Sequence, residues 1–248
     1  MPENIKYNLL SETLERMDQR DISILQNKEG YRFNSDSTLL IDFTINIIRL
    51  LPLNKQSRIA DLGSGCGILS VLCAKSNLFA KVSAYEIQES LFELTKKNIK
   101  LNHVEELIEV FNQDYTSIDN KLELLSYDFI ICNPPYTKIG DGKTSKNQEK
   151  LIARHEVKTT LETLGNAFNK LLKPTGRVFL VYPVRRLAEF IFYMKSIHLE
   201  PKTLQFIFHN KNADSELFLA ELVKGGKSSL KVLEPFFQSK EVNFSNLF

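Results

Sequence analysis

The chain alternates between two kinds of apolar spacing. Short apolar runs bounded by glycine, proline or polar residues are typical of buried strands, whereas apolar residues three and four positions apart are typical of helices. The first kind predicts strands over residues 57–63, 80–86, 107–114, 127–133, 176–183, 202–209 and 216–222. The second kind predicts helices over residues 34–51, 67–76, 88–102, 161–174 and 185–197.

This alternation predicts an α/β fold. Strands that follow one another through helices form a parallel sheet with right-handed crossovers and helices on both faces. Only the polar residues 210–215 separate the last two strands, which indicates a C-terminal antiparallel hairpin. We therefore expect a mostly parallel seven-stranded sheet in one domain, residues 36–223. An N-terminal extension, residues 1–35, would precede it, and a C-terminal tail without a partner in this scheme, residues 224–248, would follow.

The composition is that of an ordinary soluble globular protein. Of the 248 residues, 43% are hydrophobic and 25% are charged. The first residues are polar and do not resemble a secretion signal, and the most apolar stretch, residues 43–53, contains Arg49 and Pro52 and is too short to span a bilayer. We therefore expect a cytoplasmic protein with no membrane partner.

The three cysteines favour neither a disulfide framework nor a zinc site. Cys66, Cys73 and Cys132 are odd in number, form no CxxC pair and have no histidine at ligand spacing. We interpret Cys66 and Cys73 as small apolar residues on a helix face, since a catalytic thiol would need a basic neighbour and none is evident. No metal is expected.

The net charge of +2 is unevenly distributed along the chain. Residues 1–136 hold 14 Lys and Arg against 19 Asp and Glu, whereas residues 137–211 hold 14 against 6. A basic segment attracts polyanions such as nucleic acids, chiefly through phosphate contacts. The alternative is a set of solvated lysines on helix surfaces.

A glycine-rich turn follows the first predicted strand. Asp61 is followed by Gly63, Ser64, Gly65 and Gly67, and glycines here allow a ligand to approach the main chain beside a helix N-terminus. The spacing is GxGxG rather than the GxGxxG of dinucleotide sites, and an acidic residue beside a pyrophosphate would repel it. The turn therefore favours a cationic ligand, with an ordinary strand-to-helix turn as the alternative.

Acidic residues also stand at the ends of the next two strands. Glu86 can accept hydrogen bonds from both hydroxyls of a ribose, or be the first-turn acid of the following helix. Asp114 can accept from an adenine amino group, or cap a turn. Together with the glycine-rich turn, they predict that one nucleoside ligand binds at three successive strand ends.

The fourth strand ends in Asn133, Pro134, Pro135 and Tyr136. The prolines cannot continue a central ladder, so the strand stops at a rigid corner. The Asn133 side-chain oxygen and the Pro134 carbonyl are two acceptors for the hydrogens of a planar amino group, and they favour its attack on a methyl group. Tyr136 offers a stacking face for a base taken out of its stack. The structural alternative is a simple turn.

These motifs resemble those of class I S-adenosylmethionine-dependent methyltransferases that modify planar amino groups, which are Rossmann-like. Residues 30–43, "GYRFNSDSTLLIDF", residues 146–156, "KNQEKLIARHE", and residues 181–190, "VYPVRRLAEF", resemble the bacterial enzymes that methylate N6 of the adenine immediately 3′ of the anticodon in a valine tRNA. The resemblance spans residues 25–225 and leaves the C-terminal tail unexplained.

The resemblance implies a role for each motif residue. Asp61, Gly63 and Gly65 would line the methionine part of S-adenosylmethionine, Glu86 its ribose and Asp114 its adenine, while Asn133 and Tyr136 would bind the target base of the tRNA. Further residues that match the family without an evident physical role are Arg32, Asp36, Arg154 and His155. We expect the polar loop 137–156 to be mobile without RNA.

Other substrates and a binding function remain as alternatives. The same chemistry serves enzymes that methylate a glutamine of peptide release factors, but these carry a helical domain in front, and here only about 30 residues precede the first long helix. The guanine amino group of ribosomal RNA and the adenine of DNA are further options, as is a fold that binds RNA or protein without turnover. We expect a monomer without an obligate protein partner.

Overall fold

The computed structural model describes residues 11–17, 20–28, 32, 35–52, 54–119, 123–134 and 160–238. The chain divides into two compact units, which are described separately. Unit 1 comprises residues 1–115 and 242–248, and unit 2 comprises residues 116–241.

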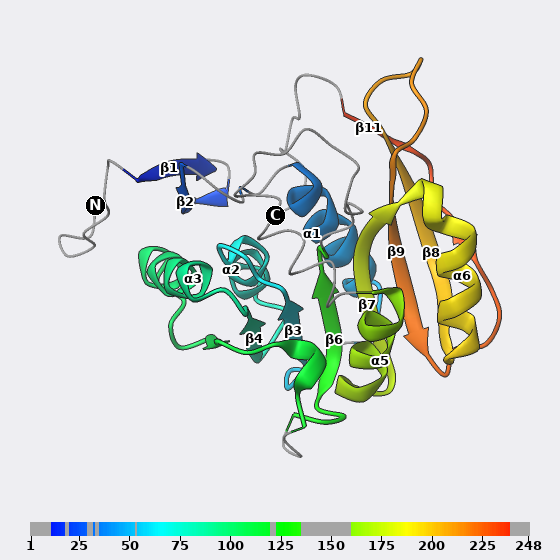
Figure 1. Cartoon of the computed structure of the whole chain (residues 1–248), viewed down its shortest axis with the longest axis horizontal. Helices are drawn as coiled ribbons and strands as arrows, with labels where there is room; N and C mark the ends of the chain where they lie inside the picture. The colour runs from blue at the N-terminus through cyan, green and yellow to red at the C-terminus, as the bar shows by residue number, and fades with distance from the viewer. Residues whose placement is uncertain are drawn as a thin grey trace. The chain divides into compact units, whose positions relative to one another are not determined.

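Unit 1 is built on three parallel strands. They are β3 (Arg58–Leu62), β4 (Lys81–Tyr85) and β5 (Ile108–Phe111), with β4 in the middle. The helices α1 (Ser35–Ile48), α2 (Ile68–Lys75) and α3 (Glu89–Leu101) belong to the same unit (Figure 1). α2 is buried along its whole apolar length, whereas α3 buries one face, because its apolar residues recur at helical spacing between charged ones.

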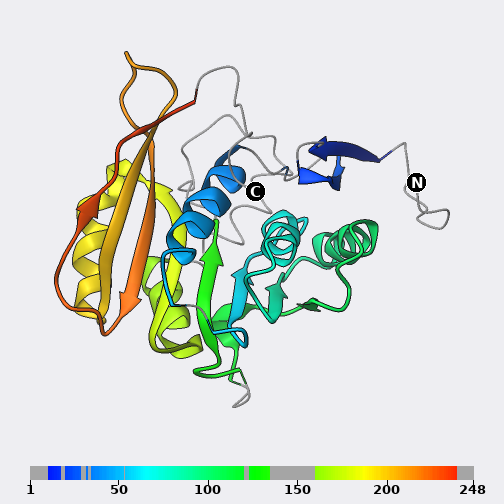
Figure 2. The ribbon, with the colours of Figure 1, turned by 180° about the vertical axis from the view of Figure 1, so that it is seen from behind.

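An antiparallel hairpin precedes these strands. β1 (Glu12–Met17) pairs with β2 (Ile22–Asn27), with Glu12 opposite Asn27 and Met17 opposite Ile22. Both views of the ribbon place the hairpin close to α2 and α3 (Figure 1, Figure 2). No strand is predicted within residues 1–35, so the hairpin is a feature that the apolar pattern misses. The boundary of the domain at residue 36 stays a prediction.

Unit 2 contains the remaining strands. β6 (Tyr127–Cys132) pairs in parallel with β7 (Leu172–Pro183), and β9 (Leu217–Lys224) lies between β7 and β8 (Leu199–Phe208), antiparallel to both. The predicted C-terminal hairpin is thereby confirmed. α5 (Leu161–Leu171) packs against α6 (Leu187–Ser196), and α6 runs beside β8 (Figure 2). Two short 3-10 helices, η2 (Tyr115–Ser117) and η3 (Val184–Arg186), complete the described helices.

Aromatic residues fill the core between α6 and the strands of unit 2. Phe190 of α6 lies 5.2 Å from Tyr182 of β7 and 5.3 Å from Phe218 of β9, ring centre to ring centre. Phe190 and Phe218 are completely buried. Such tilted and edge-on arrangements are favourable for aromatic pairs, so this cluster holds α6 on the sheet.

Part of the C-terminal tail pairs with the sheet. β10 (Lys231–Val232) and β11 (Phe236–Phe237) run parallel to β8, with Lys231 opposite Thr203 and Phe236 opposite Ile207. The Phe237 ring lies 5.5 Å from that of Phe208. The expectation that the tail has no partner is therefore wrong for these residues. Two-residue strands leave no periodic signal, which is why the pattern does not reveal them.

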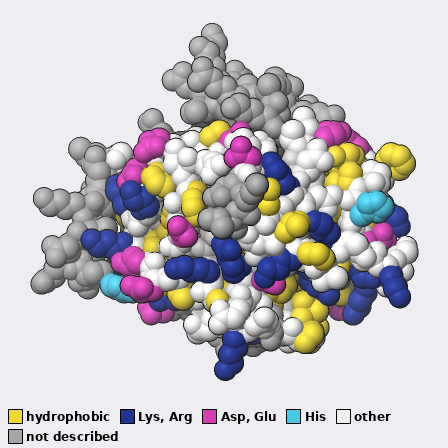
Figure 3. All heavy atoms as spheres, turned by 90° about the horizontal axis from the view of Figure 1, so that it is seen from below, with side chains coloured by type: hydrophobic (Ala, Val, Ile, Leu, Met, Phe, Trp, Pro, Cys, Tyr) yellow, Lys and Arg dark blue, Asp and Glu magenta, His cyan; other side chains and the backbone are white. Residues whose placement is uncertain are grey.

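In the face shown in Figure 3, lysine and arginine side chains are interspersed with acidic and apolar ones. Residues 137–159 of the basic segment 137–211 lie outside the described residues, and the role of the segment stays a prediction. Among the described residues, no helix combines the length and the apolar character that crossing a membrane requires.

Candidate functional site

The turn between β3 and α2 needs glycine at three positions. Gly63, Gly65 and Gly67 have φ angles of 77°, 59° and 81°, in the left-handed region that other residues avoid. At Gly67 a Cβ atom would also lie 2.7 Å from Thr95 Cγ2, which is closer than real contacts allow. We name residues 63–67 the glycine loop. The loop can take this shape because its three glycines have no side chain.

Backbone hydrogen bonds draw the ends of the three strands of unit 1 together. The N–H groups of Gly63 and Ser64 both donate to the carbonyl of Tyr85 at 2.9 Å. One strand further, the Glu86 N–H donates to the carbonyl of Phe111 at 3.0 Å. The glycine loop, Glu86 and the segment after β5 therefore lie at the same edge of the sheet, where ligands of parallel sheets bind.

Glu86 is fixed by the main chain on both sides. Its Oε2 accepts a hydrogen bond from the Gly65 N–H at 2.9 Å, and its Oε1 accepts one from the Gln88 N–H at 2.8 Å. Burial raises the pKa of Glu86, and the two N–H groups counteract part of this effect. Each carboxylate oxygen has a second lone pair, so Glu86 can accept further hydrogen bonds from a diol.

Asp61 and Ser64 each contribute a buried polar atom that has no hydrogen-bond partner among the described residues. Asp61 is fully buried, and its Oδ2 accepts a 2.6 Å hydrogen bond from the Ser70 hydroxyl. Among the described residues, neither Asp61 Oδ1 nor the buried Ser64 hydroxyl has a hydrogen-bond partner. Burial raises the pKa of Asp61 to about 7, against the lowering effect of the Ser70 hydrogen bonds. Unpaired buried polar atoms are costly, so these two point to a ligand.

The segment after β5 approaches the glycine loop. Asp114 is partly buried there, and the next residue, Tyr115, has its Cε1 atom 3.8 Å from the position that a Cβ atom would take at Gly63. The structure thus brings Asp114 to the edge that holds Asp61 and Glu86. The contact of Asp114 with an adenine stays a prediction.

Several residues of this site are not apparent from the sequence patterns. Ile87, beside Glu86, is apolar but 37% exposed, and it could pack against a flat base. Ser70 holds Asp61, and Thr95 and Asn98 of α3 bind carbonyls of the glycine loop. An apolar residue directly after the acidic strand end was the available signal for Ile87. Ser70, Thr95 and Asn98 are polar residues inside helices, and the sequence gave no signal for their role.

Asn133 and Pro134 follow β6 in unit 2. Cys132, the last residue of β6, is paired with Leu180 of β7, so Asn133 stands at the carboxyl end of this parallel pair. Pro134 is buried and Asn133 is partly exposed. Other predicted residues lie outside the described ones, namely Pro135, Tyr136, Arg154, His155 and the loop 137–156. The stacking role of Tyr136 stays a prediction.

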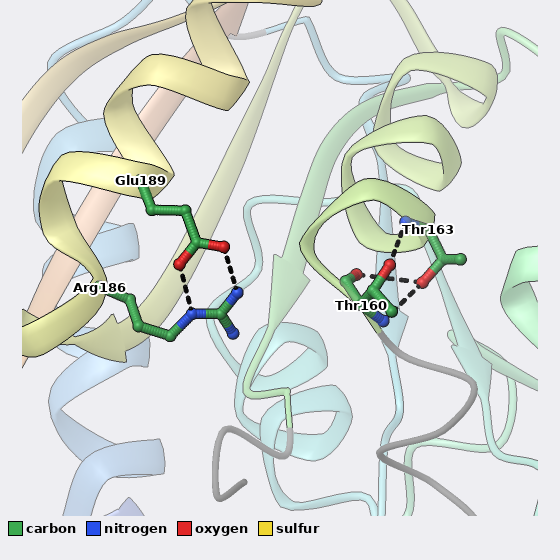
Figure 4. Close-up of polar contacts among 4 residues, drawn as sticks. All are labelled: Thr160, Thr163, Arg186 and Glu189. Atoms are coloured by element: carbon green, nitrogen blue, oxygen red, sulfur yellow. Dashed lines mark hydrogen bonds and ion pairs between the residues drawn. The ribbon is translucent and has the colours of Figure 1, made fainter.

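A capping box at Thr160 precedes the first residue of α5. The Thr160 hydroxyl accepts a hydrogen bond from the Thr163 N–H at 3.2 Å, and the Thr163 hydroxyl accepts one from the Thr160 N–H at 2.8 Å (Figure 4). This box fixes the point at which α5 begins.

The stretch 181–190 contains a fixed arginine. Arg186 donates from Nε and Nη2 to the carboxylate of Glu189 at 2.9 and 2.8 Å (Figure 4). Its guanidinium carbon lies 5.3 Å from the centre of the Tyr182 ring. The ion pair and the aromatic ring together orient the guanidinium group.

Arg32 and Asp36, which match the resembled family, have local structural contacts. Arg32 donates to the Thr13 hydroxyl at 3.1 Å and also binds Glu15, both on β1. Asp36 is buried in the first turn of α1. The position of Asp36 near a helix N-terminus is favourable for a carboxylate.

The cysteines are buried thiols. Cys66, Cys73 and Cys132 are each at most 2% exposed. Burial raises the pKa of Cys66 to about 12, so its thiol stays protonated at neutral pH. Within the described part of the chain, no group of three or more His, Cys, Asp or Glu residues is arranged to hold a metal ion.

The fold and the glycine loop with its acidic neighbours define the class of the protein as class I, Rossmann-like methyltransferases. A predicted O-methyltransferase from Agrobacterium tumefaciens has a similar fold, with a TM-score of 0.60 at 21% identity over 82% of this chain and 86% of that chain. The methyltransferase small domain family matches residues 39–185, more than half of the chain, and the chain belongs to this family.

Two relatives carry the name tRNA1(Val) (adenine(37)-N6)-methyltransferase. The one from Shewanella frigidimarina is 33% identical over 143 residues, 56% of each chain, and the one from Dyadobacter fermentans is 27% identical over 180 residues, 72% of each chain. The chain thus spans little more than half the length of the Shewanella relative. The resemblance inferred from the motifs is confirmed.

Proposed function

We propose that the chain transfers a methyl group from S-adenosylmethionine to N6 of an adenine in tRNA, namely the adenine immediately 3′ of the anticodon of a valine tRNA. The family and the names of the two relatives support the reaction and the substrate. The single structural observation that carries the proposal is a pair of buried atoms, Asp61 Oδ1 and Ser64 Oγ, that have no hydrogen-bond partner among the described residues.

We infer that residues of unit 1 bind the cofactor through their charge and their hydrogen-bonding groups. S-adenosylmethionine supplies an electrophilic methyl group on a positively charged sulfonium. A cation near Asp61 favours its ionised form, which compensates the burial of that carboxylate. Glu86 offers two fixed oxygens to the ribose hydroxyls, and Ile87 offers an apolar surface to the adenine. Gly63 and Gly65 leave the backbone accessible to the methionine part.

Asn133 and Pro134 would act on the target base. The Asn133 side-chain oxygen and the Pro134 carbonyl accept the two hydrogens of the adenine amino group, which concentrates the lone pair on its nitrogen. They stabilise the positive charge that develops there until the proton leaves to water. A strong general base is not required, since correct positioning of the nitrogen supplies most of the rate. Tyr136 would stack on the base.

A methyl-transfer assay with labelled cofactor tests the reaction. Total tRNA, DNA and a peptide release factor are offered separately, and the labelled nucleoside is identified by mass spectrometry. We expect N6-methyladenine in valine tRNA, and loss of more than about 100-fold in rate for Asn133→Ala. Asn46→Ala, at an exposed position of α1, is the matched control and should keep full activity.

The outcomes separate the candidate functions. If Asn133→Ala still transferred labelled methyl groups to tRNA as wild type does, the proposed target site would be contradicted. Label only in the release factor would identify a glutamine methyltransferase, and label in DNA or at a guanine would replace the proposed base. RNA binding without any label would indicate a binding protein.

We further propose that the enzyme acts as a monomer in the cytoplasm, where tRNA is modified. The motifs of the proposed site, from Asp61 to Tyr136, all occur within one sequence, which supports a monomer. Sedimentation of the purified protein with and without tRNA would test this proposal, and a stable dimer would contradict it.

A further inference from the structure

Asn98 of α3 and Asn102, the C-cap residue directly after α3, bind the edge of β2 that faces away from β1. Asn98 and Asn102 lie one turn apart and are 0% and 3% exposed. Asn98 Oδ1 accepts from the Leu25 N–H at 2.7 Å, and its Nδ2 donates to the Leu25 carbonyl at 2.9 Å. Asn102 pairs with Ser23 in the same way, at 3.0 and 2.8 Å. Each amide therefore replaces the peptide group of a neighbouring strand.

The spacing of the two elements explains this pairing. Four residues of a helix rise about 6 Å, and two residues of a strand rise about 6.6 Å. Side chains at i and i+4 of α3 therefore match the outward-facing peptide groups at Ser23 and Leu25. The hairpin has further anchors in unit 1, since Lys97 binds Glu12 at 2.6 Å and Arg20 binds Asp42 at 2.7 Å.

Asn98 differs from Asn102 in one further hydrogen bond. Its Nδ2 also donates to the carbonyl of Cys66, in the glycine loop, at 2.8 Å. The other hydrogen bond of Asn102 Nδ2 goes to the carbonyl of Asn98, in its own helix. Beside this, the Thr95 hydroxyl donates to the carbonyl of Gly65 at 2.8 Å. α3 thus binds two carbonyls of the glycine loop, those of Gly65 and Cys66. The Cys66 carbonyl is bound by Asn98, whose amide also binds β2.

We infer that Asn98 is a positioning residue, which transmits the docking of the β1–β2 hairpin to the glycine loop and so sets the affinity for S-adenosylmethionine. The inference rests on the proposed function for its ligand. An amide has one oxygen and two N–H hydrogens, and here the Leu25 peptide group fixes the orientation in which the amide reaches Cys66. Without the hairpin contact, the amide is free to rotate away from the loop.

The test compares two matched pairs of substitutions in the full-length protein. Asn98→Asp and Asn102→Asp each remove the N–H donors of one amide, but only the first removes a bond to the glycine loop. Leu25→Pro and Ser23→Pro remove the corresponding N–H donors from β2. Because Leu25 is fully buried, Leu25→Ala serves as the control for the loss of its side chain. Hydrogen exchange of peptides covering residues 61–68 reports the loop without any cofactor, and calorimetry reports the dissociation constant for S-adenosylmethionine.

We expect Asn98→Asp and Leu25→Pro to raise loop exchange and to weaken cofactor binding about tenfold, with kcat at saturating cofactor changed by less than about threefold. Asn102→Asp and Ser23→Pro should increase exchange in β2 but change cofactor affinity by less than about threefold. Equal effects of the two pairs on the loop would overturn the inference, because they would show general destabilisation only.

If Asn98→Asp or Leu25→Pro does not fold, Thr95→Val replaces it in the test. It removes only the hydrogen bond to the Gly65 carbonyl, and we expect increased loop exchange with weaker cofactor binding. Increased loop exchange with unchanged affinity would overturn the inference, because the order of the glycine loop would then not set the affinity for the cofactor. A wild-type protein that binds no S-adenosylmethionine would refute the proposed function, whereas the exchange data would still decide whether Asn98 positions the loop.

Discussion

The Ser70 hydroxyl donates a 2.6 Å hydrogen bond to Asp61 Oδ2, and both residues are completely buried. The first turns of α2 therefore fix one oxygen of the carboxylate and leave Oδ1 without a partner among the described residues. A buried carboxylate in this arrangement is a poor contributor to stability and a good acceptor for a cationic ligand.

Asp61→Asn should stabilise the ligand-free protein above neutral pH. The pKa of Asp61 is about 7 in the folded protein and about 4 in an unfolded chain. Because the folded pKa is raised, stability falls as the pH rises from about 4 to about 7 and then levels off. We expect Asp61→Asn to be more stable than wild type by roughly 1–3 kcal/mol at pH 8 and equally stable near pH 4, measured by denaturant unfolding.

The same substitution should weaken binding of S-adenosylmethionine about 100-fold, because a neutral amide does not attract a cation. The exposed Asp214→Asn is the matched control for both measurements. An Asp61→Asn protein that binds the cofactor as wild type does would show that the carboxylate does not face it.

Gly67→Ala should disrupt the glycine loop by more than the strain of a left-handed backbone conformation alone, because the added Cβ would also clash with Thr95. The added Cβ would lie 2.7 Å from Thr95 Cγ2, whereas at Gly225, which has a φ of 67°, nothing lies within 4 Å. We expect Gly225→Ala to cost about 1 kcal/mol and to keep cofactor affinity, and Gly67→Ala to cost more than about 2 kcal/mol and to lose it. Similar costs for both would mean that Thr95 moves aside easily.

Ile87→Ala should weaken cofactor binding while folding normally. The side chain is 37% exposed, so its loss costs little in the ligand-free protein, but contact with a base would bury it. We predict a dissociation constant about tenfold higher by calorimetry. Leu125→Ala, at a position that is 53% exposed, is the control and should have no effect. An unchanged constant for Ile87→Ala would place the adenine elsewhere.

Binding of tRNA should depend strongly on salt. If the basic segment 137–211 contacts phosphates, affinity should fall at least about tenfold between about 50 and about 200 mM salt, because bound counterions are released. Fluorescence anisotropy with labelled tRNA would measure this, with S-adenosylmethionine binding followed in the same buffers for comparison. If the affinity for tRNA did not change with salt, these lysines would be solvated surface residues that do not contact phosphates.

The sequence predicted those elements whose apolar spacing is regular. Strands β3 to β9 overlap the seven predicted strands, but β8 begins three residues before its predicted start and β7 begins at Leu172, inside the predicted helix 161–174. The helix ends before Pro174, which cannot continue it. β1 was missed because "ETLERM" is mostly polar, and β2, whose outer edge binds the amides of Asn98 and Asn102, was missed because its apolar run is short. The site was predictable at strand ends, where Asp61 and Glu86 stand, because topology brings these ends together.

Residues that support the site from within helices were not predictable. Asn98 and Asn102 lie in "KKNIKLN", where a buried amide cannot be distinguished from an exposed one. Their role depends on the position of β2, which is distant in sequence and was not predicted. Long-range partners of this kind become visible only when the fold is known.

Pairing of β10 and β11 with β8 also affects how molecules behave toward one another. β8 pairs with β9 on one side, and its other side would otherwise present a row of unsatisfied amides and carbonyls to solvent. Each molecule instead covers this row with residues 231–237 of its own chain. Where β10 and β11 pair with it, this edge of β8 is closed to strand pairing with another molecule.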